Sequence, residues 1–118
     1  MKIKTIVELL NAKVLCGEDH LDGEVHSACG CDMMSDVLAF VKEQAVLITG
    51  LCNPQVVRTA LMMDMRCIVF VRGKMPSEEV VELADSAGLV VLASEERMYV
   101  ACGLLYANGL SGGSVLND

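Results

Sequence analysis

Short apolar runs alternate with amphipathic stretches along most of this chain. The clearest run, residues 45–48, is followed by Thr49-Gly50 and then by Asn53-Pro54. An Asn directly before a Pro is typical of a helix start, because Asn caps the first turn and Pro fits the first helical position. The pattern therefore predicts a buried strand, a tight turn and a helix from Pro54. Two further apolar runs predict strands of the same kind, at residues 67–71 and 89–93.

Apolar residues with helical spacing fill the segments between these runs. Asp32, Ser77 and Ser94 are expected to cap helix starts, because short polar side chains accept N–H groups of the first turn. Gly88 and Gly109 are expected to end helices, since glycine readily adopts the left-handed conformation found there. The predicted helices cover residues 5–11, 33–41, 54–63, 77–87 and 94–108, and looser patterns predict strands at 13–16 and 24–31.

The predicted strands recur with a regular spacing. Ala45, Cys67 and Leu89, which begin three of them, lie 22 residues apart, a length that fits one strand, one helix and two short loops. Strands alternating with helices imply parallel pairing through βαβ crossovers. We therefore expect an α/β domain over residues 1–110, with a three-layer, open, mostly parallel sheet built from repeated βα units. Residues 13–16 would add an edge element, and residues 111–118 look like a flexible tail.

Composition constrains how the core is built. Hydrophobic residues make up 53% of the chain, yet aromatic residues only 3%, so the core must consist of Val, Leu, Ile, Ala and Met. So high an apolar fraction in a small chain indicates either contact with a second copy or a parallel sheet buried on both faces. Both explanations stay open at this point.

The charge and the segment lengths exclude several classes of partner. The net charge of -7 argues against nucleic acid, because binding to phosphates needs a basic surface. No apolar run approaches the roughly 20 residues of a membrane span, and residues 1–4 do not lead into the apolar core of a signal peptide. We expect a cytoplasmic protein that binds neither nucleic acid nor membrane.

The six cysteines mostly lie inside apolar runs, where a free thiol behaves as a small hydrophobic side chain. Cys29 and Cys31 would share one face of a strand, so that a metal or iron–sulfur site with Asp32, His20 or His26 can be constructed. Structural zinc sites usually have paired C-x-x-C spacing, and iron–sulfur sites have a cysteine-rich run. Neither pattern is present, so we expect no metal and no cofactor. A redox or metal accessory role for Cys29 and Cys31 is the alternative.

Open α/β sheets bind ligands beyond the carboxyl ends of their strands. The loops expected there lead into helix N-termini, which favour anions, and Arg72 and Lys74 add positive charge to an otherwise acidic chain. The plainer interpretation is that these residues are only turns, caps and solvated charges. Neither G-x-G-x-x-G nor G-x-x-x-x-G-K-[ST] occurs, and no nucleophile–base pair is visible, so no catalytic residue is predicted. The candidate ligand-binding residues are Thr49, Gly50, Asn53, Arg72, Gly73, Lys74 and Ser94.

The order of elements resembles the DRTGG domain family over about residues 1–110. The stretches that carry the resemblance are IVELLNAKVLCGEDHLDGEV and AVLITGLCNPQVVRTALMMDMRCIVFVRGKMPSEEVVELADSAGLVVLAS, followed by the helix that begins near Glu95. The family's Asp-Arg pair falls on Cys52-Asn53 and its Thr-Gly-Gly on Val71-Arg72-Gly73, so only Gly73 is retained.

The resemblance implies a fold like that of the N-terminal domain of HPr kinase. It also implies a relation to domains beside CBS modules in regulated pyrophosphatases and to domains in some phosphate acetyltransferases. In those proteins the domain is non-catalytic and tends to pair with itself, and stand-alone members are typical of anaerobic bacteria and archaea. Some stand-alone members are associated with iron–sulfur proteins or hydrogenases. We therefore expect a non-catalytic regulatory or scaffold domain that forms a homodimer and binds a small anionic ligand, such as a nucleotide or a phosphorylated metabolite.

Overall fold

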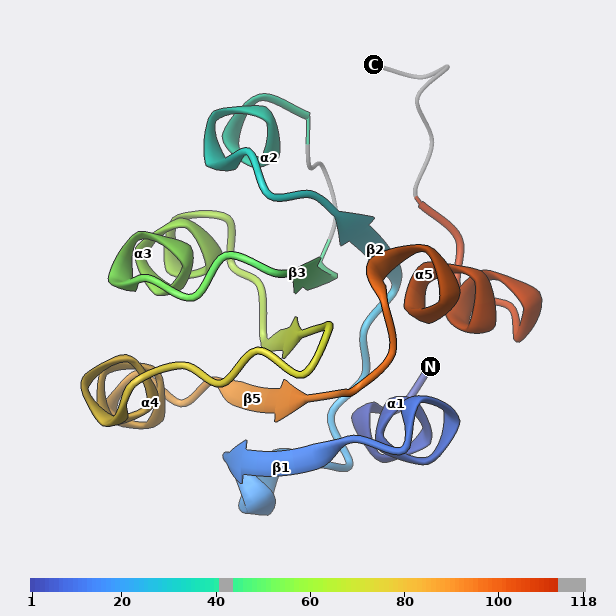
Figure 1. Cartoon of the computed structure of the whole chain (residues 1–118), viewed down its shortest axis with the longest axis horizontal. Coiled ribbons are helices and arrows are strands. Elements are labelled where there is room, and N and C mark those ends of the chain that lie inside the picture. The colour runs from blue at the N-terminus through green and yellow to red at the C-terminus, as the bar shows by residue number, and fades with distance from the viewer. Residues whose placement is uncertain (41–43, 113–118) are drawn as a thin grey trace.

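A five-stranded sheet with the order β1-β5-β4-β3-β2 forms the middle layer of the part of the chain that the computed structural model describes, residues 1–40 and 44–112 (Figure 1). Strands β2 to β5 are parallel, and β1 pairs with β5 in the antiparallel direction. The predicted parallel sheet and its edge element are confirmed. The strands are β1 (Lys13–Cys16), β2 (Ser27–Gly30), β3 (Ala45–Thr49), β4 (Cys67–Phe70) and β5 (Val90–Ala93).

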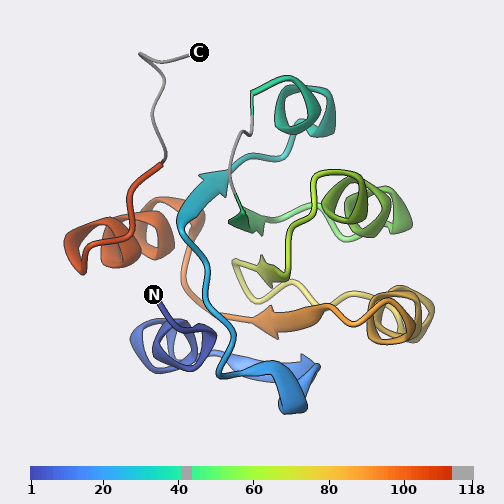
Figure 2. The ribbon, with the colours of Figure 1, turned by 180° about the vertical axis from the view of Figure 1, so that it is seen from behind.

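Helices cover both faces of this sheet, as the alternating pattern predicts. Helices α2, α3 and α4 lie on one face, whereas α1 and α5 lie on the other (Figures 1 and 2). The chain passes from β2 through α2, α3 and α4 to β5 by placing each new strand next to the previous one. The helices are α1 (Ile3–Leu10), α2 (Met34–Phe40), α3 (Pro54–Met62), α4 (Glu78–Ser86) and α5 (Met98–Ala107), with a 3-10 helix, η1, at Glu18–His20.

Some expectations fall outside the described residues. The predicted end of the second helix at Val41 and most of the predicted tail, residues 113–118, belong to this group. Within residues 1–40 and 44–112, no helix has both the length and the apolarity that crossing a membrane requires.

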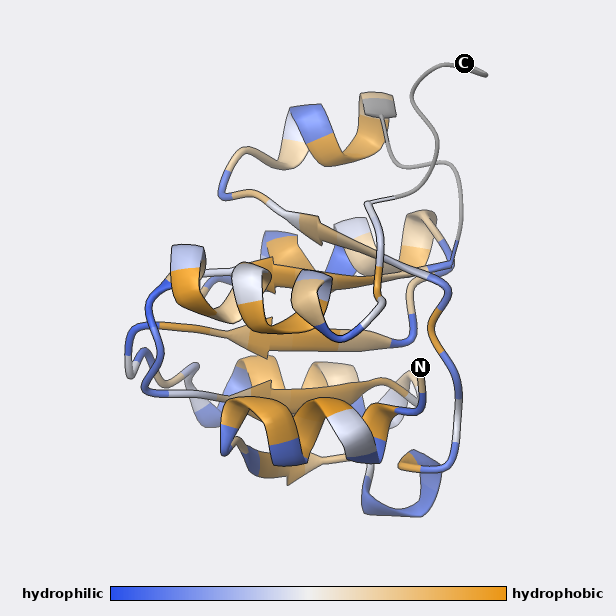
Figure 3. Ribbon diagram, turned by 90° about the vertical axis from the view of Figure 1, so that its right-hand side faces the viewer, coloured by the Kyte–Doolittle hydropathy of each residue, from blue (hydrophilic) through white to orange (hydrophobic). Residues whose placement is uncertain are grey.

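The core consists of two apolar clusters, one on each face of the sheet. Leu47, Ile68 and Phe70 point toward α2, α3 and α4, while the alternate residues Ile48 and Val69 point toward α1 and α5. All five are fully buried. A strand that is covered on both faces has to be apolar at every position, which explains the continuous runs in the sequence. The hydropathy colouring in Figure 3 shows the mostly apolar strands between the two helix layers, and it shows hydrophilic residues in several helices and in the connecting loops.

Two local predictions are wrong. The last helix begins at Met98, with Arg97 as its N-cap, and not near Glu95. The Ser94 hydroxyl does not cap that helix. It is buried, donates a hydrogen bond to the Leu10 carbonyl at 2.8 Å and accepts the N–H of Glu96, which lies before the helix.

Candidate functional site

The loops that follow β2, β3 and β4 meet at the carboxyl edge of the parallel sheet. Because β2 pairs with β3 and β3 with β4 in parallel register, the ends of these strands lie side by side. Asp32 follows β2, Gly50 follows β3, and Arg72 follows β4. Contacts between these three residues define the candidate site.

Arg72 has an unusual backbone conformation. Its φ is 62°, and Gly73 follows with a φ of 68°, while the Lys74 N–H donates to the Val71 carbonyl at 3.1 Å. Two consecutive left-handed residues closed by this bond make a turn of type I′. The left-handed conformation costs a non-glycine residue roughly 1–2 kcal/mol. It is held here by hydrogen bonds from the Arg72 N–H to the Glu96 carbonyl, 2.7 Å, and from the Gly73 N–H to the Ser94 carbonyl, 3.0 Å.

The side chain of Arg72 lies against the turn after β3. A Cβ atom at position 50 would overlap the Arg72 guanidinium, so that only glycine leaves room for it there. The backbone of Gly50 is not left-handed. Glycine at position 50 therefore makes room for the Arg72 side chain, and it is not needed for an unusual backbone conformation.

Asp32 closes the same turn from the side of β2. Its carboxylate accepts hydrogen bonds from the Gly50 N–H and from the Thr49 hydroxyl, both at 2.8 Å. The bond from Gly50 is the largest cause that lowers the pKa of Asp32 below its ordinary value. The bond from Thr49 and the charge of Arg72 act in the same direction, whereas partial burial opposes them. Asp32 is therefore ionised at neutral pH.

Asp32 has a different role from the helix cap that the sequence predicts. Its contacts span 17 and 18 residues of chain and exist because β2 and β3 are paired in register. The Gly50 N–H and the Thr49 hydroxyl, which were expected to face a ligand, are held by this internal carboxylate. The only sequence signal for Asp32 as a site residue is its place directly after a strand that ends at the same edge as Thr49-Gly50.

Charges of both signs surround the site. Lys74 is exposed, and its charge and that of Arg72 lower the pKa of Cys52, while Asp32 raises it. Burial has the largest effect and raises the pKa of Cys52 overall, so this thiol is protonated at neutral pH. On the other side of the turn, the Glu95 carboxylate lies against Gly73, where a Cβ atom would come within 2.8 Å of its Oε2.

The remaining predicted site residues lie at the margin of this arrangement. Ser94 is buried and its hydroxyl accepts the Glu96 N–H at 3.2 Å, which fixes the loop before α5. Asn53 begins α3 without a side-chain cap bond, and its Oδ1 is buried with no hydrogen-bond partner among the described residues. The structure therefore brings together Thr49, Gly50, Arg72, Gly73 and Lys74, adds Asp32, and places the side chains of Ser94 and Asn53 inside the fold.

The cysteines have properties that disfavour reactivity. Cys29 and Cys31 pack on the face of the sheet that α2 and α3 cover, so the prediction that they share a face is confirmed. Burial, together with the neighbouring thiols Cys31 and Cys102, raises the pKa of Cys29 to about 11. Among the residues that the structure describes, no three His, Cys, Asp or Glu side chains are grouped so that they could hold a metal ion. These observations give no support to the alternative redox or metal role.

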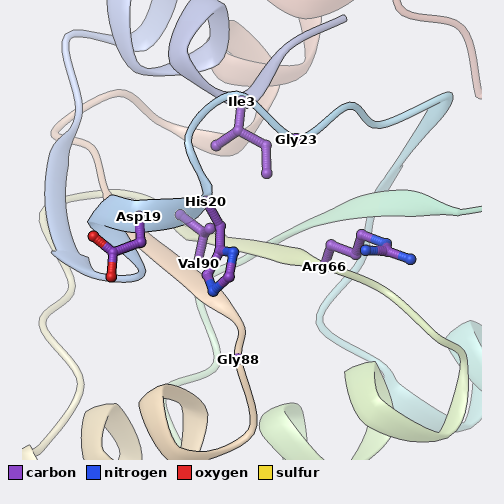
Figure 4. A pocket seen from close by; sticks show the side chains of 7 residues that line it. All are labelled: Ile3, Asp19, His20, Gly23, Arg66, Gly88 and Val90. Atoms are coloured by element: carbon purple, nitrogen blue, oxygen red, sulfur yellow. The ribbon is translucent and has the colours of Figure 1, made fainter.

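A pocket of about 260 Å³ lies at the opposite, amino edge of the parallel strands. It lies between η1 and the residues that precede β4 and β5, and Asp19, His20 and Arg66 line it together with apolar and glycine residues. Figure 4 shows the ring of His20 in the middle, with the side chains of Asp19 and Arg66 pointing away on either side. None of the predicted ligand-binding residues lines this pocket.

The fold and the site define a small three-layer α/β domain in which charged loops gather at the carboxyl edge of the sheet. The chain belongs to the DRTGG domain family, whose family model matches residues 5–106. This match confirms the resemblance on which the sequence prediction rests. No curated protein matches the chain.

A solved structure with a similar fold is the crystal structure of the CBS and DRTGG domains of the regulatory region of Clostridium perfringens pyrophosphatase, complexed with its activator, diadenosine tetraphosphate. The TM-score is 0.70 at 18% sequence identity, and the alignment covers 88% of this chain. The chain spans 45% of the length of that regulatory region. At this identity the likeness establishes the fold.

Proposed function

We propose that this chain is a non-catalytic regulatory domain that self-associates and binds a small anionic ligand at the loops after β3 and β4. The observation that carries the ligand site is Arg72, which is held in a left-handed conformation with its guanidinium over Gly50. Strained backbone of this kind persists only where the surroundings fix it, and it is concentrated at binding and active sites.

The side chains around Gly50 suit a phosphate-bearing ligand. A guanidinium can donate two parallel hydrogen bonds to a phosphate, and Lys74 adds a mobile positive charge in the same loop. Asp32 and Glu95 bring acceptors close to these donors. A ligand that combines phosphate groups with N–H donors, as a nucleotide does, would match both signs of charge.

The related regulatory region from C. perfringens is complexed with diadenosine tetraphosphate. This supports adenine nucleotides as the first ligands to test on this chain. Because the Arg72 N–H donates to the Glu96 carbonyl, a ligand that moves Arg72 would also act on the loop that leads into α5. That connection offers a route by which ligand binding could regulate a partner.

The test is a titration of the full chain with AMP, ATP, diadenosine tetraphosphate and phosphorylated sugars, followed by calorimetry and thermal unfolding. A variant with Arg72→Gln and Lys74→Gln should lose affinity by about tenfold or more, because it removes two charged hydrogen-bond donors. Arg58→Gln, an exposed charge on α3, is the matched control and should bind like the wild type. Wild-type affinity in the double variant, or no binding of any of these compounds to the wild type, would overturn the proposed site.

A further inference from the structure

Helix α5 has no charged side chain, whereas each of the helices α1 to α4 in the described part of the chain carries at least one. Its inner face, with Ala101 and Leu105, is buried against the sheet. Its outer face leaves Tyr99 89% exposed and Tyr106 74% exposed, with Val100 beside them at 43%. A helix that is apolar all round is normally covered on all sides, yet α5 lies on the outside of its layer (Figure 1).

Gly103 lies in the middle of this outer face. It follows Tyr99 by four positions and precedes Tyr106 by three, which places all three residues on one side of the helix. Apart from its own helix backbone, a Cβ atom at position 103 would meet no atom of the described residues within 4 Å, and the backbone there is not left-handed. Nothing in residues 1–40 and 44–112 therefore requires glycine, although glycine weakens a helix interior relative to alanine. A glycine between two exposed aromatic side chains allows another backbone to approach closely.

The net charge of the chain indicates through which surface two copies can meet. With a net charge of -7 on each copy, two copies repel one another, and this repulsion is weakest where the surfaces that meet carry no charge of their own. Helix α5 offers such a surface over its whole length. In a two-fold dimer the same face of each copy meets its counterpart. An uncharged face suits this arrangement because it does not place like charges opposite one another, and a central glycine leaves room for the facing helix.

The other large apolar side chains that are exposed in the described residues lie in loops or on helices that carry charge, and Met33 and Met75 are the ones in loops. Leu38, Leu61 and Met62 are exposed on α2 and α3, but these helices also carry Asp36 and Arg58. Tyrosine, by contrast, is among the residues most enriched in the centres of protein interfaces.

We propose that two copies of this chain pair through the outer face of α5, with the two α5 helices crossing at Gly103. This inference rests on the self-association proposed above and names its surface. In this arrangement Tyr99 and Tyr106 of each copy flank the crossing point and become buried.

The first test is sedimentation equilibrium of the full chain from about 1 to 200 µM, a range that brackets typical micromolar association. The wild type should be a dimer at the upper end, and Tyr99→Glu should be a monomer throughout. Met62→Glu is the matched control, since it also adds one negative charge at an exposed apolar residue, 71% exposed, but on α3. It should remain a dimer. Far-UV circular dichroism of both variants should match the wild type, because neither side chain is buried.

The second test uses Gly103→Ala. In the monomer this substitution should raise the midpoint of thermal unfolding by a few degrees, because alanine favours the helix more than glycine does and its methyl group meets no other side chain. At the crossing point the added methyl groups should raise the dissociation constant of the dimer by about tenfold or more.

The outcomes separate the surface from the self-association. A wild type that stays monomeric overturns the self-association itself, and the α5 surface with it. A wild-type dimer that persists in Tyr99→Glu, or that is lost equally in Met62→Glu, overturns the α5 surface and leaves self-association standing. A dimer that is unchanged or tighter in Gly103→Ala overturns the crossing point.

Discussion

At the scale of single residues, Asp32 shows how one carboxylate can fix a turn at the edge of a sheet. It accepts two hydrogen bonds from the β3 turn, and its pKa is lower in the folded chain than its ordinary value. A group whose pKa is lowered by folding stabilises the folded state above its unfolded pKa, because the unfolded state then binds protons more readily. That contribution is lost as the pH falls through the folded pKa.

The resulting prediction concerns how the free energy of unfolding of the Asp32→Asn variant depends on pH. The Asn side chain resembles the protonated form of Asp. At pH 7 the variant should have a free energy of unfolding about 1 kcal/mol below that of the wild type, a value that allows for the exposure of Asp32. The difference should hold down to about pH 4 and shrink below it, toward the folded pKa. Urea unfolding of both proteins between pH 7 and pH 3 measures this. A difference that stays constant across the range would mean that the charge of Asp32 has no part in it.

Gly50→Ala tests the position of the Arg72 guanidinium without removing a charge. The added methyl group would overlap the guanidinium and displace it, whereas the backbone of Gly50 accepts alanine without strain. The free energy of unfolding should change by less than about 1 kcal/mol, because the displaced group is the end of a flexible side chain. Affinity for the anionic ligand should fall as far as it does in Arg72→Gln. When Gly50→Ala and Arg72→Gln are combined, the two losses of affinity should not add, since both remove the same interaction. Additive losses of affinity in calorimetry would show that Gly50 acts separately from Arg72.

At the scale of elements, two helix starts of similar sequence differ in their capping. The Ser77 hydroxyl accepts the Val80 N–H at the start of α4, at 3.4 Å, whereas Asn53 makes no such bond at the start of α3. Ser77→Ala should therefore lower the free energy of unfolding by about 1 kcal/mol, and Asn53→Ala by less than about 0.5 kcal/mol. Urea unfolding of the two variants at pH 7 gives the comparison. An equal loss in both would indicate that Asn53 caps α3 in solution.

Elements whose signals are local could be predicted from the sequence, and those that depend on distant contacts could not. Strand β3 is a continuous apolar run because both its faces are buried, so its position follows from local composition. Gly88 ends the α4 segment with a φ of 79°, as a glycine after a helix often does. The start of α5 lies later than predicted because the Ser94 hydroxyl donates to the Leu10 carbonyl, 84 residues away, and accepts the Glu96 N–H within the loop before the helix.

The same distinction applies to the candidate site. The loops with Gly50 and Arg72 could be expected at one edge, because the carboxyl ends of parallel strands coincide. The left-handed conformation of Arg72 could not be expected, since it depends on hydrogen bonds to the backbone of Ser94 and Glu96. Asp32 was missed for a similar reason: its bonds require β2 and β3 in register.

At the scale of the whole molecule, the candidate ligand site and the α5 surface are neighbours along the chain. The Arg72 N–H bonds to the Glu96 carbonyl, and α5 begins two residues later at Met98. A ligand that pulls on Arg72 would therefore act at the N-terminal end of the helix that is proposed to pair with a second copy. By thermodynamic linkage, if the ligand tightens the dimer, dimerisation must tighten ligand binding by the same factor.

The overall charge leads to a prediction for salt. Two copies with a net charge of -7 repel one another, and this repulsion reaches about 30 Å at 0.01 M ionic strength but only about 10 Å at 0.1 M. If the copies meet at the uncharged face of α5, salt screens the repulsion between the copies and removes no attraction between charges. The dissociation constant of the dimer should then fall several-fold as NaCl rises from about 0.01 to 0.3 M, and level off once the screening is complete. Sedimentation equilibrium across this series measures the effect, with Arg58→Gln, which makes each copy more negative, as a variant whose dimer should respond more steeply to salt. A dimer that weakens as salt is added would instead be held by ion pairs, and the interface would have to lie on a charged surface away from α5.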